Sequence, residues 1–372
     1  MSDLIQLLTA DGVRVEHPDV AFSPDPSLLD TYGDEPGVLR ALLRDMTLVR
    51  RFDVEATALQ RHGELGLWPS SLGQEAAQIG AGRALAPGDY VFPTYRDHGI
   101  AWCRRIDPVD LLGVFRGTDH VGWDPEEKRY APVTIVIGAH TLHAVGYALG
   151  ALHDGAVGTG DASRDTAVLA CFGDGATSQG DVNEAMVFAA SYHVPVVFFL
   201  QNNHWAISEP VTRQSRIPLV QRAAGFGFPG YRVDGNDVLA TYAVVQRALE
   251  HARTGQGPVL VEAVTYRMGA HTTTDDPTRY RTDDDLEVWR RRDPIDRLAR
   301  YLRTTGGADD AWFAALEAEA DELGADVRAR CHALPDPSPL VSFDATYAEI
   351  TPTLAAQRAE VAALLDGTEV AR

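Results

Sequence analysis

The segment between residues 167 and 205 constrains the fold of this chain more than any other. It reads AVLACFGDGATSQGDVNEAMVFAASYHVPVVFFLQNNHW. Val168–Phe172 and Val194–Leu200 are short runs of β-branched and aromatic residues, which are typical of strands buried on both faces. Asp181–Tyr192, between them, carries an apolar stripe at helical spacing, and Asp181 is suited to cap its N-terminus. Strand, helix and strand over about 30 residues predict one right-handed βαβ unit with neighbouring parallel strands.

Polar side chains follow both strands, at the edge where open α/β sheets bind their ligands. Asp174 follows the first strand and Asn203 the second, so the unit brings a carboxylate and a carboxamide to the same edge. With a nearby backbone carbonyl they form a set of hard oxygen ligands, which suits Mg²⁺ or Ca²⁺ that is also held by phosphate and suits zinc poorly. Gly175 allows a ligand to approach the backbone closely. A Gly-Asp-Gly turn by itself usually only reverses the chain, and the spacing to the Asn-Asn pair is what favours a site.

Composition excludes several classes of protein. The 372 residues are 45% hydrophobic, which is ample for a large core, and the net charge of −20 disfavours nucleic acid and anionic membranes as partners. No apolar run reaches about 18 residues, and the N-terminal sequence MSDLIQLLTADG lacks the zones of a secretory signal. Three widely spaced cysteines without a CxxC motif indicate reduced thiols. We expect a soluble, cytoplasmic protein with no membrane association.

The rest of the sequence predicts one large α/β domain with additions at both ends. Residues 1–35 are rich in Pro, Asp and Gly and are predicted to form an arm, with a disordered tail as the alternative. Residues 36–280 are predicted to form a doubly wound, mostly parallel sheet flanked by helices, beginning with an amphipathic helix over 36–63. Residues 281–372 are predicted to form a helical C-terminal extension packed on the same domain, with helices at 283–292, 295–304, 309–332 and 351–366.

Two loops carry polar residues whose types alone leave their roles open. Tyr95 and Arg96 lie in FPTYRDHG, where the planar guanidinium suits phosphate oxygens and the phenol adds a donor. The alternative is a surface ion pair between Arg96 and Asp97. His271 lies in the polar loop RMGAHTTTDD, where a histidine is usually solvated, although an imidazole of near-neutral pKa also serves to place a proton or to donate to a diphosphate.

Several stretches, taken in order, resemble one family. GDG, 26 intervening residues and NN are similar to the thiamine-diphosphate and Mg²⁺ signature, and GDGATSQGDVNEA with QNNHWAIS resembles the version in α subunits of two-chain 2-oxo acid dehydrogenases. GLWPSSLGQEAAQIG, FPTYRDHG, VIGAHTLHAVGYALG and YRMGAHTTTDDPTRYR match in the family's order. The resemblance covers roughly residues 35–365. It implies a thiamine-diphosphate-binding fold that catalyses oxidative decarboxylation of a 2-oxo acid and reductive acylation of a lipoyl group.

The resemblance also implies the ligands of the metal and of the cofactor around it. It assigns Mg²⁺ to Asp174, Asn203 and the backbone carbonyl of Trp205. Gly175 and Ala176, next to the first of these, are implied as further contacts to thiamine diphosphate.

The remaining site residues come from the other matching stretches. By resemblance, Tyr95, Arg96 and His271 hold the diphosphate region, and His271 begins a loop that orders over the cofactor. His120, in RGTDHVGW, stands 17 residues before Ile137, which is the family's spacing for a second active-site histidine, but the sequence around it departs from the family's pattern and a surface histidine is the alternative. His120 and His271 are the candidates for positioning substrate or lipoyl group and moving protons. Ile137 is expected to be buried, either as an ordinary strand residue or against the rings of the cofactor.

A partner chain is implied as well. In this family the glutamate that activates the cofactor comes from a separate β subunit, and this chain is too short to contain both cofactor-binding domains. We therefore expect an α₂β₂ assembly, with the cofactor at a subunit interface, that docks on a lipoyl-bearing acyltransferase core. The expected substrate is a small 2-oxo acid, with branched-chain acids favoured over pyruvate, and acetoin dehydrogenases share the same α architecture.

Two other functions make different demands on the sequence. A non-catalytic Mg²⁺- and nucleotide-binding regulator on the same fold needs G-x-G-x-x-G after an early strand, with an acidic residue about 20 positions on, and no such segment opens a helix here. A thiamine enzyme complete in one chain, of the transketolase type, would be active without a partner.

Overall fold

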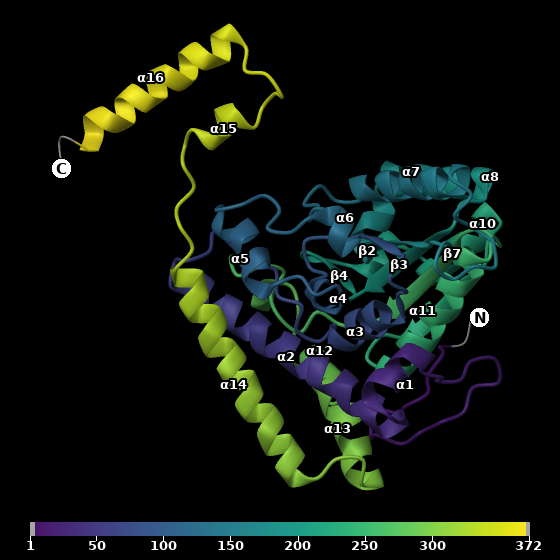
Figure 1. The fold of residues 1–372 in the computed structure, drawn as a ribbon. Coiled ribbons are helices and arrows are strands. Elements are labelled where there is room, and N and C mark those ends of the chain that lie inside the picture. Colours follow the sequence, from purple (N-terminus) through teal and green to yellow (C-terminus); the bar gives the residue numbers. More distant parts are fainter. Residues whose placement is uncertain (1–3, 370–372) are drawn as a thin grey trace.

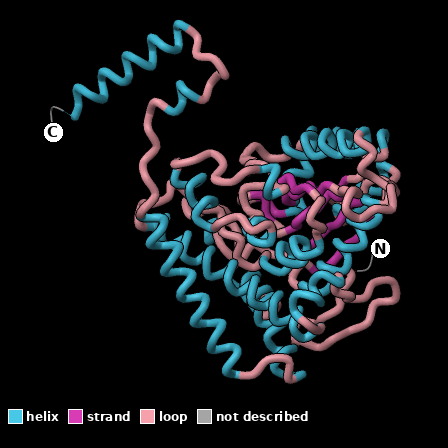
Figure 2. The backbone as a smooth tube through the Cα atoms, in the orientation of Figure 1, coloured by secondary structure: helices cyan, strands magenta, loops and turns pink. Residues whose placement is uncertain are grey.

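The computed structural model describes residues 4–369 and contains a central parallel sheet with helices on both faces (Figures 1 and 2). Five strands form this sheet in the order β1-β2-β3-β7-β6, and two short strands form a separate antiparallel hairpin. The sheet strands are β1 (Tyr90–Phe92), β2 (Val168–Gly173), β3 (Val196–Asn202), β6 (Gly230–Asp234) and β7 (Val259–Val264), and the hairpin strands are β4 (Trp205–Ala206) and β5 (Glu209–Pro210).

Helices make up most of the remaining chain. The α-helices are α1 (Pro26–Tyr32), α2 (Glu35–Arg61), α3 (Glu75–Ala84), α4 (His98–Cys103), α5 (Pro108–Arg116), α6 (Pro125–Lys128), α7 (Ala139–His153), α8 (Gly180–Tyr192), α9 (Val211–Gln214), α10 (Arg222–Phe226), α11 (Val238–Arg253), α12 (Asp283–Arg290), α13 (Pro294–Thr305), α14 (Asp310–His332), α15 (Val341–Asp344) and α16 (Pro352–Glu369). Three short 3₁₀ helices are η1 (Asp174–Ser178), η2 (Leu219–Gln221) and η3 (Pro277–Arg279).

The two faces of the sheet are covered by different sets of helices. Alternate side chains of each strand point to opposite faces, so Leu169 and Cys171 join one hydrophobic core while Val168 and Ala170 join the other. The first core contains residues of α2, α3, α11, α13 and α14, and the second contains residues of α7, α8 and α10. Because both faces are buried, the strands read as continuous apolar runs. The predicted fold class, a parallel sheet flanked by helices on both sides, is confirmed.

The predicted βαβ unit is present as β2, α8 and β3. The two strands are paired in parallel, from Val168 beside Val196 to Gly173 beside Gln201. One detail differs from the prediction: Asp181 does not cap α8, because η1 takes up the residues after β2 and the helix begins at Gly180. Asp181 therefore lies inside the first turn, where its carboxylate still interacts favourably with the helix dipole.

The described part of the N-terminal segment, residues 4–35, covers an edge of the sheet. Ile5 pairs in parallel with Val233 of β6, and Leu7 and Leu8 are buried. Asp237 accepts hydrogen bonds from the backbone amides of Leu7 and Leu8 at 2.7 and 2.6 Å. The alternative of a disordered tail is wrong for these residues, because an exposed sheet edge is a ready site for backbone pairing and this segment fills it. Residues 1–3 lie outside the described part of the chain.

The C-terminal extension begins as predicted but does not all pack on the domain. α13 and α14 contact α2, whereas α15 and α16 project away from the body (Figure 1). Of the side chains described after Cys331, none is buried. The expectation of an extension packed along its whole length is therefore wrong for α15 and α16, since apolar side chains such as Val341, Tyr347 and Ile350 stay exposed within the described residues. The boundaries at residues 35 and 280 stay predictions.

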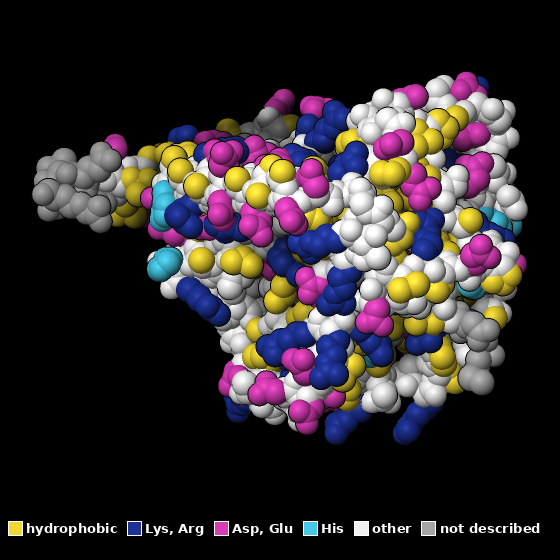
Figure 3. Space-filling model, turned by 90° about the horizontal axis from the view of Figure 1, so that it is seen from below, with side chains coloured by type: hydrophobic (Ala, Val, Ile, Leu, Met, Phe, Trp, Pro, Cys, Tyr) yellow, Lys and Arg dark blue, Asp and Glu magenta, His cyan; other side chains and the backbone are white. Residues whose placement is uncertain are grey.

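Charged side chains of both signs lie on the surface. Seen from below, basic and acidic side chains are interspersed over one face of the molecule (Figure 3). Some oppositely charged side chains are paired, as Arg44 is with Glu319. Within residues 4–369, no helix is long and apolar enough to cross a membrane. All three cysteines are free thiols.

Candidate active site

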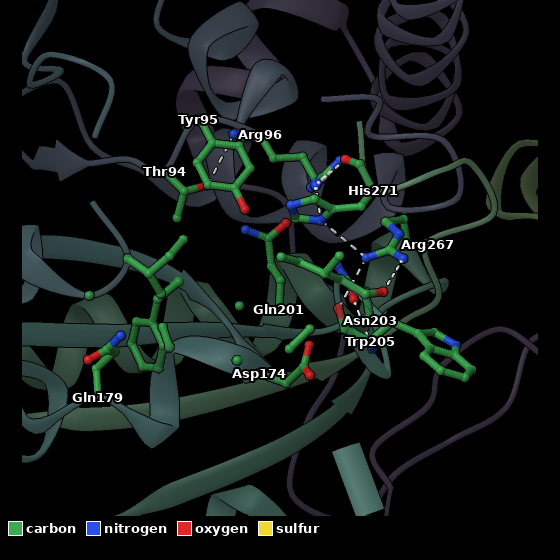
Figure 4. A pocket seen from close by; sticks show the side chains of 18 of the residues that line it. Thr94, Tyr95, Arg96, Asp174, Gln179, Gln201, Asn203, Trp205, Arg267 and His271 are labelled. Carbon is green, nitrogen blue, oxygen red and sulfur yellow. Dashed lines mark hydrogen bonds between the residues drawn. The ribbon is translucent and has the colours of Figure 1, made fainter. Parts of the chain in front are cut away.

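A cavity of about 280 Å³ lies at the carboxyl ends of β2 and β3. Ligands bind at this edge in open parallel sheets. Figure 4 shows Tyr95, Arg96 and His271 along one side, with Asp174 facing them from the other. All but one of the predicted site residues line this cavity: Tyr95, Arg96, Ile137, Asp174, Gly175, Ala176, Asn203, Trp205 and His271.

Asp174 is a buried carboxylate whose hydrogen-bond partner is neutral. It opens η1 directly after β2, and its Oδ2 accepts a hydrogen bond from Nε2 of Gln214 at 3.0 Å. Burial raises the pKa of Asp174 to about 6, and the hydrogen bond from Gln214 offsets only part of that effect. A nearby cation would favour the charged form, so this environment suits a metal ion as partner.

Two further oxygens of the predicted metal set line the same cavity. Oδ1 of Asn203 accepts a hydrogen bond from the backbone amide of Trp205 at 3.2 Å, and Nδ2 of Asn203 donates to Oε1 of Gln74 at 3.1 Å, which fixes the orientation of the amide. The carbonyl oxygen of Trp205 accepts from Arg267 at 3.2 Å. No cluster of three His, Cys, Asp or Glu residues suited to a metal occurs within the described chain, so this set offers one carboxylate with two neutral oxygens.

Arg96 is not paired with Asp97. Its guanidinium donates to the backbone carbonyls of Ser70 and His271, while Asp97 accepts from the amide of Thr94 and the side chain of Gln201. The guanidinium also lies 5.4 Å from the ring centre of the adjacent Tyr95. The surface ion pair is therefore wrong. Arg96 is a mostly buried cation at the cavity, and no carboxylate in the described part of the chain is paired with it.

Arg267 is a second buried cation at the cavity and was not singled out from the sequence. Its side chain is 0% exposed and donates to the carbonyls of Trp205 and Ile207 and to the hydroxyl of Tyr280, at 3.2, 2.8 and 2.9 Å. Burial, with repulsion from Arg96, lowers the pKa of Arg267 to about 10. All of these partners are neutral, so the positive charge has no direct counter-ion among the described side chains.

His271 is held as a neutral imidazole. Its Nδ1 lies 3.3 Å from Nη2 of Arg96 and 3.4 Å from Nη1 of Arg267. Because guanidinium nitrogens only donate, Nδ1 is the acceptor and the ring proton is on Nε2. Burial and the two positive charges lower the pKa of His271 to about 3. The side chain is therefore prepared to donate one hydrogen bond without carrying charge.

The loop around His271 closes on itself. Asp275 accepts from the backbone amide of His271 at 2.8 Å and from the hydroxyl of Tyr280. Arg281 donates to the carbonyls of Arg267, Met268 and Gly269. These contacts hold the backbone of His271 and Arg267 in place. A loop without hydrophobic periodicity can therefore position both side chains at the same cavity.

Comparison with known proteins places the chain in a family. The sequence model of the family described as "Dehydrogenase E1 component" matches residues 43–339. The chain belongs to this E1 family. It is 45% identical to "3-methyl-2-oxobutanoate dehydrogenase subunit alpha" of Mycobacterium tuberculosis over 89% of this chain and 88% of the relative. It is 35% identical to "Pyruvate dehydrogenase E1 component subunit alpha" of Acholeplasma laidlawii over 89% of this chain and 94% of the relative. The predicted resemblance to α subunits of this dehydrogenase class is confirmed.

Two predicted residues of the E1 chain differ from expectation. His120 is exposed and does not line the cavity, because the loop that carries it runs over the surface after α5. Ile137 does line the cavity but is 41% exposed, and its neighbours Ile135 and Val136 are 63% and 69% exposed. The expected burial of Ile137 is wrong, because the segment before α7 forms no sheet strand and no other segment of residues 4–369 buries it.

Residues that sequence reasoning missed are chiefly neutral or arginine side chains. Gln74 and Gln214 orient Asn203 and Asp174, and Arg267 supplies the second cation. Arg267 lies within the matching stretch YRMGAHTTTDDPTRYR, so the resemblance pointed at its segment but not at its role. Glutamines at such distant positions carry no local signal, because their function depends on which loops the sheet brings together.

The residues of the E1 chain fit the cofactor of the family. Membership of the E1 family implies thiamine diphosphate. Two buried arginines without a carboxylate partner supply positive charge for a diphosphate, and Nε of Arg267 has no hydrogen-bond partner in the described structure. Asp174, in the same cavity, is a carboxylate suited to a cation. The donor set therefore matches a diphosphate that carries a divalent metal.

Proposed function

We propose that this chain is the α subunit of a 2-oxo acid dehydrogenase and that its cavity binds thiamine diphosphate through Mg²⁺. One observation carries the proposal: the cavity holds groups of both signs whose partners are neutral. Asp174 is bonded to an amide, and Arg96 and Arg267 are bonded to carbonyl or hydroxyl oxygens and the neutral His271. A ligand that brings a cation and an anion together, as a magnesium diphosphate does, satisfies both ends at once.

Within this proposal the residues of this chain bind the cofactor, orient it and place a proton beside it. Asp174, Asn203 and the carbonyl of Trp205 hold the metal, and Arg96 and Arg267 neutralise the diphosphate. Thiamine diphosphate, when bound, supplies the nucleophilic carbon and the electron sink for decarboxylation. His271 presents Nε2–H beside the diphosphate region, where it donates a hydrogen bond and does not add charge. Its position makes it the better candidate for proton placement, while His120 keeps that role only if a partner chain brings it to the site.

Exposed apolar residues at the mouth of the cavity are evidence for a partner chain. Ile207, which lines the cavity, is 55% exposed, and Ile135 and Val136 lie next to the cavity residue Ile137 with their side chains in solvent. Contiguous exposed apolar residues of this kind mark interaction surfaces. We infer that a β subunit covers this rim in an α₂β₂ assembly, that the cofactor lies between the two chains, and that the assembly acts on a lipoyl-bearing acyltransferase core.

We infer that branched-chain 2-oxo acids are the substrate class. The relative named for 3-methyl-2-oxobutanoate shares 45% of residues with this chain, against 35% for the relative named for pyruvate, over an equal share of the chain. Pyruvate is the alternative substrate.

The test has two parts. Calorimetry with thiamine diphosphate and Mg²⁺ on the chain assembled with a candidate β chain should show binding that NAD does not reproduce, and Asp174→Ala should weaken it strongly. The assembly should then turn over 3-methyl-2-oxobutanoate faster than pyruvate with an artificial electron acceptor, while the α chain alone should be inactive. Turnover by the lone chain, or an unchanged affinity in Asp174→Ala, would contradict the proposal.

A further inference from the structure

Asp53 is a buried carboxylate to which the proposed function gives no role. It lies on the inner face of α2, 2% exposed, on the same helix as the core residues Phe52 and Ala56. Within residues 4–369 its side chain accepts hydrogen bonds but forms no ion pair. Burial raises the pKa of Asp53, and its hydrogen bonds and the charge of Arg96 offset only part of that effect. An apolar residue would avoid this cost, so the carboxylate has a reason other than stability.

Asp53 holds the connecting segment, defined as residues 68–72, which lies between α2 and α3. Oδ1 of Asp53 accepts from Nε1 of Trp68 at 2.9 Å and from the backbone amide of Ser71 at 3.0 Å. Oδ2 accepts from the hydroxyl of Ser70 at 2.6 Å. Three donors from four consecutive residues converge on one carboxylate, so Asp53 sets the conformation of the connecting segment.

The connecting segment in turn holds Arg96. The carbonyl oxygen of Ser70 accepts from Nη1 of Arg96, while the hydroxyl of the same serine donates to Asp53. A single residue therefore links the carboxylate to the guanidinium without an ion pair between them. This arrangement fixes the position of Arg96 and leaves its charge available to a diphosphate.

The same segment holds the loop of His271 at two points. The backbone amide of Thr273 donates to the carbonyl of Trp68 at 3.0 Å, and the amide of Trp68 donates to Oγ1 of Thr273 at 3.0 Å. The amide of Met268 donates to the carbonyl of Leu72 at 3.0 Å. His271 lies between these two points, so a displacement of the connecting segment would move the histidine together with the arginine.

We propose that Asp53 is a positioning residue for the diphosphate end of the cavity, and that it acts on Arg96 and on the His271 loop through the connecting segment. The inference rests on the proposed function, which assigns both groups to the diphosphate region. The alternative is a purely structural carboxylate that stabilises the contact between α2 and the connecting segment. The two differ in what they predict for ligands with and without phosphates.

The experiment compares variants assembled with a candidate β chain from the neighbouring reading frame. Asp53→Ala removes the acceptor, and Asp53→Asn keeps one oxygen for Trp68 and Ser71 while its amide donates to the Ser70 hydroxyl. Ser70→Ala removes only the hydroxyl. Asp237→Ala is the matched control, because Asp237 is also a buried carboxylate that holds backbone amides but does not line the cavity or touch the connecting segment.

Three quantities are measured for each variant. Calorimetry gives the dissociation constants of thiamine diphosphate with Mg²⁺ and of thiamine without phosphates, and urea unfolding of the α chain gives its stability. The rate of tryptic cleavage of the His271 loop is measured without cofactor, so that it reports on the loop independently of binding.

We expect Asp53→Ala to raise the dissociation constant of thiamine diphosphate about 10- to 100-fold, to leave that of thiamine unchanged and to speed cleavage of the loop. Asp53→Asn should restore the affinity to within about threefold of the wild type, and Ser70→Ala should weaken it at least about threefold. Asp237→Ala should lose stability and keep both affinities and the cleavage rate.

Equal losses of affinity for the two ligands, or a loss of stability in Asp53→Ala with no change in affinity, would overturn the proposal. If Asp53→Ala does not fold, Ser70→Ala decides, and an unchanged affinity for thiamine diphosphate in that variant counts against the proposal. Absence of thiamine diphosphate binding in the wild-type assembly would contradict the proposed function alone, because the cleavage rate of the loop still tests whether Asp53 positions it.

Discussion

Replacing Arg267 by methionine should weaken cofactor binding without destabilising the chain. Arg267 is 0% exposed and its partners are neutral, so the folded chain bears the cost of a buried cation without a counter-ion. The pKa of Arg267 falls from 12.5 to about 10, and at 1.36 kcal/mol per unit this corresponds to about 3 kcal/mol of unfavourable free energy. Removing the charge relieves that cost.

The same substitution also removes hydrogen bonds whose total free energy is similar to the relieved cost. The carbonyls of Trp205 and Ile207 and the hydroxyl of Tyr280 lose their donor, and each lost hydrogen bond costs about 1 kcal/mol. The free energy of unfolding should therefore change by no more than about 1 kcal/mol. Cofactor binding loses a hydrogen bond between charged groups, which contributes about 1.5–3 kcal/mol, so the dissociation constant for thiamine diphosphate should rise about 10- to 150-fold.

Arg297→Met is the matched control. Arg297 is also buried, at 1% exposed, but it is paired with Asp234 at 2.8 Å and lies away from the cavity. Breaking a buried pair from one side costs about 3–5 kcal/mol, because a buried carboxylate is left behind. This variant should lose stability and keep the cofactor affinity of the wild type.

Two measurements separate the outcomes. Urea unfolding of each chain gives its stability, and calorimetry of the assembled enzyme gives the affinity for thiamine diphosphate with Mg²⁺. Thiamine without phosphates should bind to Arg267→Met as it binds to the wild type. The reasoning is refuted if Arg267→Met is destabilised as strongly as Arg297→Met while its affinity for thiamine diphosphate is unchanged.

Three further predictions concern the scaffold. Burial lowers the pKa of His98 to about 4, so at mildly acidic pH the unfolded chain takes up a proton that the folded chain excludes. The free energy of unfolding should therefore fall as the pH drops below about 6.5, by about 2 kcal/mol at pH 5. His98→Phe should reduce this pH dependence, as measured by urea unfolding at several pH values. Asp275→Ala removes the acceptor for the amide of His271, and should speed tryptic cleavage of the loop and weaken cofactor binding; equal cleavage rates would contradict this. Asp237→Ala leaves four backbone amides without their acceptor and should cost about 3 kcal/mol or more by urea unfolding, with faster hydrogen exchange at residues 5–8.

The sequence was most predictive where local pattern and topology coincide. The apolar runs before Asp174 and Asn203 predicted both strands. Because a βαβ unit of ordinary length makes its two strands neighbours, the two side chains were predicted to lie at the same edge, as they do. His271 could be placed only through the resemblance, because its loop has no periodicity. His120 was placed by spacing alone, and spacing does not determine where a surface loop runs.

Features that depend on contacts between distant residues could not be predicted from local sequence patterns. The N-terminal segment looked like a possible tail because it is rich in Pro, Asp and Gly, yet Asp237, more than 200 positions away, holds its backbone against the sheet edge. Ile137 and α16 show the reverse case, in which residues expected to be buried are exposed. Their apolar character predicted burial, but a single sequence does not state whether the covering atoms belong to the same chain.

The neutral partner of Asp174 leads to a last prediction. Gln214 bonds to Asp174 without neutralising it, and Arg267 is held by carbonyls, so the two charges of opposite sign remain available to a ligand. Gln214→Arg would place a guanidinium against the carboxylate and form an ion pair within the chain. Mg²⁺ would then have to break a charged hydrogen bond of about 1.5–3 kcal/mol, and its affinity in the presence of thiamine diphosphate should fall at least about tenfold, whereas Gln214→Ala should have a smaller effect. Calorimetric titration of Mg²⁺ into the assembled enzyme decides the matter, and tighter binding in Gln214→Arg would show that Asp174 is not the metal ligand.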